Sequence, residues 1–84
     1  MSTANVEYVT VYAGSRLDEK QREAGISDED LCRGADITTE TLRLWKAGRY
    51  SPKASKLARM ATILGCQVGD FFITRQLTLD AEAR

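Results

Sequence analysis

Histidine is absent from the sequence, proline occurs once and cysteine twice, and no apolar run is long. Without histidine the chain lacks the commonest general base and the commonest metal ligand, which argues against acid–base catalysis and against a metal centre. The longest apolar cluster, Phe71-Phe72-Ile73, is far too short to cross a membrane. A signal-peptide pattern of basic start, apolar core and small-residue cleavage site is also missing, so the sequence predicts a cytoplasmic protein.

The few groups that remain for chemistry form no recognisable site. Cys32 and Cys66 fall on apolar helical positions without a metal-ligand spacing, which favours reduced thiols packed in the core over a disulfide. No nucleophile–base pair, metal cluster or phosphate-binding loop is visible. The sequence therefore predicts no enzyme, no cofactor, no metal site and no small-molecule substrate.

The charged residues are divided unevenly along a chain whose formal net charge is zero. Residues before Ile37 carry eight acids against four bases, whereas the stretch from Ile37 to Cys66 has Glu40 as its single acid. The bases of that stretch are Arg43, Lys46, Arg49, Lys53, Lys56 and Arg59. This division favours one positive and one negative face, although charge alone is equally compatible with an ordinary solvated surface.

Residues that start and stop helices predict the organisation of the middle of the chain. The N-terminal signals are Ser15, Ser27, Thr38 and the Ser51-Pro52 pair, and the stops are Gly25, Gly48 and Gly65. These signals predict four helices, the first at about 16–24, and a short fifth helix follows at about 68–72. The inner stripe of the fourth helix is Ala54, Leu57, Ala58, Ala61 and Leu64.

Apolar spacing joins the second and third helices into one motif. Leu31 lies on the inner side of the second helix and Leu42 and Trp45 on that of the third, with 36–38 between the helices. This is the spacing of a helix–turn–helix, and residues 48–52 form its exit turn. It predicts one short helix presented to the outside, with polar and basic residues on its free face. Such a helix can enter the major groove of DNA.

Both ends of the chain have strand-like patterns. Residues 6–12 are rich in β-branched and aromatic side chains, and residues 73–79 alternate apolar and polar side chains. A helix competes for the first segment, since Val9, Ala13 and Leu17 also fit a helical stripe, but a strand is our prediction. Because a lone two-stranded ribbon is marginal in water, we expect these segments to be the dimerisation elements of a homodimer.

From about Leu17 to Phe72 the sequence resembles the XRE-type helix–turn–helix family, which includes lambdoid phage repressors and Cro proteins. The matching residues are Gly25-Ile26-Ser27, Leu31, Ile37-Thr38, Thr41-Leu42, Trp45, Gly48, Pro52, Leu57, Ala61, Leu64-Gly65 and Phe71. The resemblance implies a mainly α, five-helix, lambda-repressor-like DNA-binding fold that works as a dimer on a palindromic site. We expect residues 1–84 to form this single domain, with its core at about 15–72.

The same resemblance implies which side chains meet DNA. Thr39, Glu40 and Leu44 would face base edges, with Glu40 accepting from cytosine N4 and Leu44 touching a thymine methyl. Thr38 would cap its helix and bond a phosphate, and Arg43 lies on the same free face. Apart from the resemblance, Arg49, Lys53 and Lys56 flank the exit turn, where we expect contacts to DNA phosphates, and Lys46 is a further candidate for such a contact. A solvated helix face is the alternative for all of these residues.

Three positions depart from the family pattern. Many members begin the second helix with a phosphate-binding glutamine, where this chain has Asp28, whose carboxylate we expect to repel a phosphate. Many have glutamate at position 46, paired with an arginine in the first helix. With Lys46 and Gln21 at these positions, we expect the usual internal ion pair of the family to be absent. Leu44 replaces a base-reading glutamine or arginine.

Together these features predict a sequence-specific DNA-binding transcriptional regulator, a phage or prophage Cro-type repressor whose dimer occludes an operator. The protein would act in the bacterial cytoplasm, or in the cytoplasm of the host cell if a phage encodes it. An antitoxin with the same fold is the nearest alternative. Another is a protein-interaction module that has lost DNA binding, which the acidic run Asp28-Glu29-Asp30 motivates.

Overall fold

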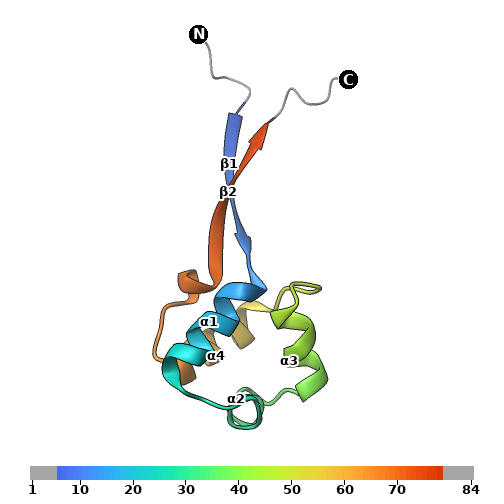
Figure 1. Cartoon of the computed structure of the whole chain (residues 1–84), viewed down its shortest axis with the longest axis vertical. Helices are drawn as coiled ribbons and strands as arrows, with labels where there is room; N and C mark the ends of the chain where they lie inside the picture. The colour runs from blue at the N-terminus through green and yellow to red at the C-terminus, as the bar shows by residue number, and fades with distance from the viewer. Residues whose placement is uncertain (1–5, 79–84) are drawn as a thin grey trace.

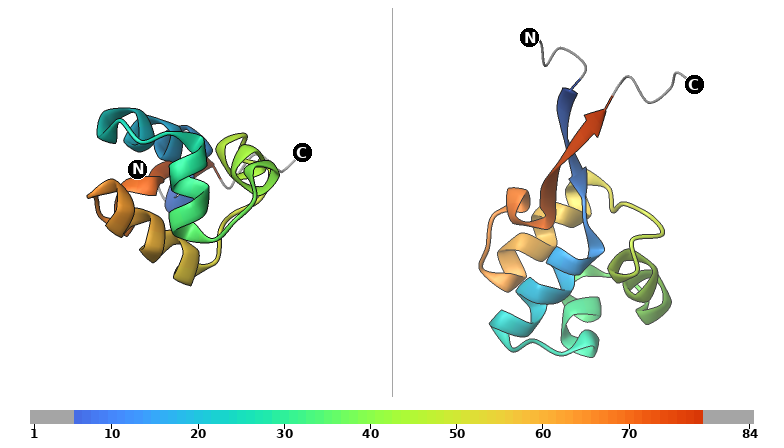
Figure 2. Two further views of the ribbon diagram at one scale, coloured as in Figure 1. Left: turned by 90° about the horizontal axis from the view of Figure 1, so that it is seen from below. Right: turned by 45° about the horizontal axis from the view of Figure 1, so that its top comes forward.

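The computed structural model describes residues 6–78, in which two strands enclose a series of helices along the chain. The elements are β1 (Val6–Tyr12), α1 (Gly14–Ala24), α2 (Asp28–Ala35), α3 (Thr39–Lys46), α4 (Ala54–Leu64), the 3₁₀ helix η1 (Val68–Phe71) and β2 (Phe72–Thr78). The helices form one body, from which the strands project as a twisted ribbon (Figure 1). Figure 2 places α2 at the end of this body opposite the ribbon and α3 along one side.

The mainly helical fold and the two terminal strands are confirmed, but a fold of five α-helices is not. The part of the chain that the structure describes has four α-helices, and the fifth predicted element is the four-residue 3₁₀ helix η1. Its first turn is fixed by the Gln67 backbone N–H, which donates to the Asp70 carboxylate over 3.0 Å. The helix stops after Phe71 because Phe72 already pairs with Tyr12 in the sheet.

Two of the four predicted N-terminal caps are confirmed, and two are wrong. The Ser27 hydroxyl caps α2 and the Thr38 hydroxyl caps α3, each accepting a backbone N–H over 3.1 Å. However, α1 begins at Gly14 rather than after Ser15, and α4 begins after Lys53 rather than at Ser51-Pro52. The early start of α1 follows from close packing. A Cβ on Gly14 would lie 2.3 Å from the Lys46 carbonyl oxygen, so only glycine lets the two backbones approach.

One apolar core joins the four helices and η1. Its largest fully buried side chains are Phe71, Leu17, Leu31, Leu42 and Met60, and Trp45 is buried beside them as its spacing predicted. On α4 the stripe differs in part from the prediction, because Ala54 and Ala58 are exposed and Met60 is buried. Cys32 is buried and Cys66 half-buried, and both are free thiols as predicted.

The ribbon is tied at its base to the end of α3. Strands β1 and β2 pair antiparallel from Val6–Thr78 to Tyr12–Phe72, and the Tyr12 hydroxyl donates to the Trp45 carbonyl over 2.8 Å. The Tyr12 ring meets Phe72 edge to face, with 6.2 Å between centroids. Burial raises the pKa of Tyr12 to about 12, so the hydroxyl stays a donor at neutral pH. Residue 79 of the second predicted strand lies outside the described residues.

Candidate nucleic-acid interface

A tight turn between α2 and α3 leaves one face of α3 exposed to solvent. The turn passes through Asp36, which has a left-handed backbone with φ of 60°, and the Ile37 N–H donates back to the Cys32 carbonyl over 3.0 Å. A short polar side chain such as aspartate tolerates this conformation better than a bulky one. The chain then enters α3 through the Thr38 cap.

No helix within residues 6–78 is long and apolar enough to span a membrane.

The free face of α3 is polar, as its sequence predicted. Leu42 and Trp45 are 1% and 8% exposed and anchor the helix on the core, whereas Thr39, Glu40 and Arg43 are exposed and Leu44 is half-buried. At 3.6 residues per turn, positions 40, 43 and 44 lie on the side of the helix opposite positions 42 and 45. Glu40, Arg43 and Leu44 therefore share one outward surface, and Thr39 lies beside it.

Two of these side chains form a two-point ion pair along α3. The Arg43 guanidinium donates through Nε to Glu40 Oε1 over 3.1 Å and through Nη2 to Glu40 Oε2 over 2.5 Å. The hydrogen bonds between the two groups, and then the charge of each partner, lower the pKa of Glu40 and raise the pKa of Arg43. Both side chains remain about two-thirds exposed, at 63% and 65%.

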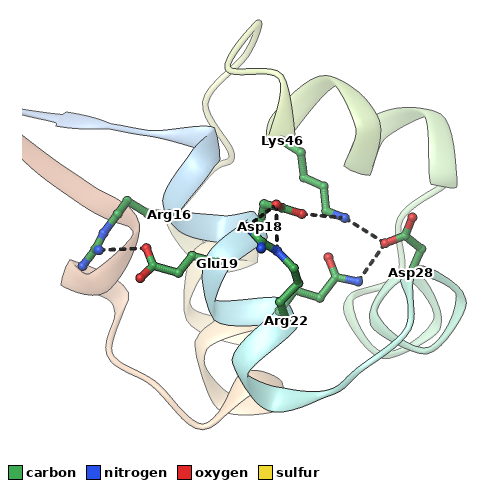
Figure 3. A network of polar contacts seen from close by, with 7 residues as sticks. Arg16, Asp18, Glu19, Arg22, Asp28 and Lys46 are labelled. Atoms are coloured by element: carbon green, nitrogen blue, oxygen red, sulfur yellow. Dashed lines mark hydrogen bonds and ion pairs between the residues drawn. The ribbon is translucent and has the colours of Figure 1, made fainter.

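Lys46, at the last turn of α3, makes internal contacts. Its Nζ lies 2.9 Å from Asp28 Oδ1 and 3.4 Å from Asp18 Oδ1, so one ammonium group joins α3 to α1 and α2 (Figure 3). The usual family pair is absent, as expected, because Lys46 and Gln21 occupy its two positions. Lys46 instead pairs with aspartates at other positions, which the sequence analysis did not predict. Arg22 also pairs with Asp18 at 3.0 Å.

The Asp28 carboxylate is consequently shared rather than free. It accepts from Lys46 and, over 2.7 Å, from Gln21 Nε2, and these two hydrogen bonds lower its pKa. The predicted repulsion between Asp28 and a phosphate remains a prediction. Gln21 is 5% exposed and also donates to the Ile26 carbonyl over 2.9 Å, so it holds the α1–α2 turn.

Sequence reasoning missed Asp18 and Gln21 as partners of this network. They lie three residues apart in α1, which places them on one face of the helix. The available signal for the network was this spacing, together with the unusual lysine at position 46 and the aspartate at position 28. Neither residue matches a DNA-contact motif, and the contact of Asp18 with Lys46 bridges 28 positions of sequence.

The remaining basic residues separate into two groups. Lys56 donates to the Ala35 carbonyl over 2.8 Å, and Arg59 to the Gly34 carbonyl over 3.0 Å, so both bind the C-terminal end of α2. Cations suit that end of a helix because its carbonyls carry partial negative charge. Arg49 and Lys53 are exposed, and their side chains form no hydrogen bond or ion pair within the described residues.

Comparison with known proteins agrees with this geometry. Residues 16–76 match the family model described as the Cro/C1-type HTH DNA-binding domain, which supports a DNA-binding transcription regulator. The restriction-modification controller protein C.AhdI from Aeromonas hydrophila has a similar fold, with a TM-score of 0.64 and 22% identity over 70% of this chain and 89% of that chain. No curated protein matches the sequence.

Proposed function

Since the chain belongs to the family of Cro/C1-type helix–turn–helix DNA-binding domains, we propose that it regulates transcription by placing α3 in the major groove of a specific operator. The observation that carries the proposal is the outward face of α3. Glu40 and Arg43 are exposed there beside half-buried Leu44, while Leu42 and Trp45 fix the opposite face to the core.

We propose different DNA contacts for different side chains of this surface. Thr39, Arg43 and Leu44 read base edges, because they lie on or beside the free face of the helix. Glu40, which the sequence predicted as a base contact, lies on the same face with both carboxylate oxygens bonded to Arg43. Thr38, Arg49 and Lys53 contact phosphates, since Thr38 caps the start of α3 and Arg49 and Lys53 lie in the segment between α3 and α4. The sequence predicted that Lys46 and Lys56 contact the DNA backbone. We propose that both instead keep their contacts within the protein, which hold α2 and α3 in place.

The mode of action that we propose is that of a phage or prophage Cro-type repressor, a dimer that occludes its operator in the cytoplasm. The ribbon supports dimerisation. By register, Val9, Val11 and Ile73 share one face of the sheet, which has two strands within residues 6–78, and Ile73 is 39% exposed. A second copy would cover this face and give a two-fold arrangement that suits a palindrome. Removing residues 74–84 should convert a dimer to a monomer by light scattering, and a monomeric full-length protein contradicts the dimer.

A protein-interaction module is the second candidate function. It is favoured by the internal neutralisation of Arg43 and Lys46, which weakens the positive field of the proposed DNA surface. An antitoxin, or a controller like C.AhdI, would use the same DNA surface for a different regulatory circuit.

Selection of binding sites from random duplexes tests the proposal. A repressor enriches a palindromic sequence, whereas a module that has lost DNA binding enriches none. On the selected site Arg43→Ala should cost about 1–3 kcal/mol, because a base contact is lost. Lys53→Ala is the matched control, since loss of a phosphate contact weakens all sequences about equally. Unchanged affinity in both variants would exclude α3 from the groove.

A further inference from the structure

Building on the proposed DNA-binding function, we propose that Glu40 is a positioning residue that turns Arg43 into a reader of guanine. The evidence is the way the two side chains meet. Glu40 occupies Nε and Nη2, which form the side edge of the planar guanidinium. The end edge, formed by Nη1 and the second hydrogen of Nη2, has no partner within residues 6–78.

The free end edge matches a base edge in the major groove. Guanine presents two adjacent acceptors there, N7 and O6, and an arginine fork binds both at once. The five N–H donors of arginine lie in one plane, so a carboxylate on the side edge fixes the direction of the end edge. Glu40 therefore orders a long side chain before DNA arrives and reduces the entropy lost on binding.

The pair also reduces the attraction of Arg43 to phosphates. A lone arginine on an exposed helix is drawn to any phosphate, and such contacts carry no sequence information. In the pair its charge is balanced by a carboxylate at hydrogen-bond distance. Both side chains are about two-thirds exposed, so the pair is accessible to a duplex without unfolding of the helix. Glu40 thereby favours guanine and disfavours non-specific binding.

Glu40→Gln tests this inference, because it removes the charge and keeps the shape. First, Arg43→Ala identifies the guanine position in the selected site. Replacing that G·C pair by A·T should weaken wild-type binding by about 5- to 150-fold, the range for one two-point contact. In the Glu40→Gln variant the same base-pair replacement should weaken binding much less. Affinity for random duplex should rise, and the slope of log K against log salt should steepen by about 0.9 per subunit.

Two matched variants exclude simpler explanations. Glu19→Gln removes the same charge from another Arg–Glu pair spaced i, i+3, the 2.9 Å contact with Arg16 on α1, and should change neither readout. Arg43→Lys keeps the charge but loses the fork, so it should lose the guanine preference while retaining affinity for random duplex.

The outcomes separate this inference from the function on which it rests. Absence of binding to any duplex in low salt overturns both. Sequence-specific binding with an unchanged or stronger guanine preference in Glu40→Gln overturns only the role of Glu40. An equal response in Glu19→Gln also overturns it, because the effect would then be one of net charge. Circular dichroism of each variant establishes that α3 remains folded.

Discussion

Replacing Lys46 by methionine, which keeps the apolar stem and removes the charge, should destabilise the fold without unfolding it. The ammonium group contacts Asp28 at 2.9 Å and Asp18 at 3.4 Å, and the Lys46 side chain is 22% exposed whereas those of Asp28 and Asp18 are 61% and 40% exposed. Partly exposed ion pairs each contribute about 0.2–1 kcal/mol. We therefore expect a loss of about 0.5–1.5 kcal/mol, which for a domain of this size lowers Tm by roughly 4–8 °C per kcal/mol.

A double-mutant cycle isolates the contact that joins α2 to α3. Urea unfolding of wild type, Lys46→Met, Asp28→Asn and the double variant, followed by circular dichroism, should give a coupling of about 0.3–1 kcal/mol at low salt. At 1 M salt the Debye length is about 3 Å, so the coupling should shrink. Coupling below about 0.2 kcal/mol, or coupling that salt leaves unchanged, would refute the network as an electrostatic link.

Three further predictions concern other parts of the fold. Trp45→Ala should lose about 3–5 kcal/mol of the roughly 5–15 kcal/mol available and be partly unfolded by circular dichroism, whereas a fully stable variant would show that the ring is not core. Gly14→Ala should destabilise by about 1–3 kcal/mol in urea, because its Cβ would meet the Lys46 carbonyl at 2.3 Å, while exposed Ser15→Ala stays within about 0.5 kcal/mol. The pKa of Asp28 is lowered from 3.8, so its stabilising effect is complete well above that pH and is lost as pH falls through the folded-state pKa. The stability difference between wild type and Asp28→Asn should shrink accordingly in urea titrations below about pH 4, and a difference that grows there contradicts the assignment.

The helical part of the fold was predictable because local signals and apolar spacing agree there. Ser27 and Thr38 cap the helices that they precede, and Gly25 and Gly65 end α1 and α4 with φ of 69° and 70°. The start of α1 was not predictable from capping propensity. It depends on the approach of Gly14 to the end of α3, a contact between segments about 30 positions apart.

The candidate site was predictable as a surface but not as a set of contacts. The exposed face of α3 follows from the burial of Leu42 and Trp45, which helical periodicity indicates. Which bases are engaged internally does not follow from periodicity. Lys46 pairs with acids on two other helices, and Lys56 donates to carbonyls at the end of α2, so both contacts depend on how the helices pack.

The proposal that α3 is the DNA-binding surface is tested most directly by an NMR titration of the 15N-labelled protein with its selected duplex. In low salt we expect the backbone amide shifts to change along Thr39–Lys46 and at Arg49 and Lys53. Lys53→Ala should weaken the titration, and added salt should reverse it because the phosphate contacts release counterions. Unchanged α3 amides while shifts appear elsewhere, or no shift with any duplex in low salt, would contradict the account.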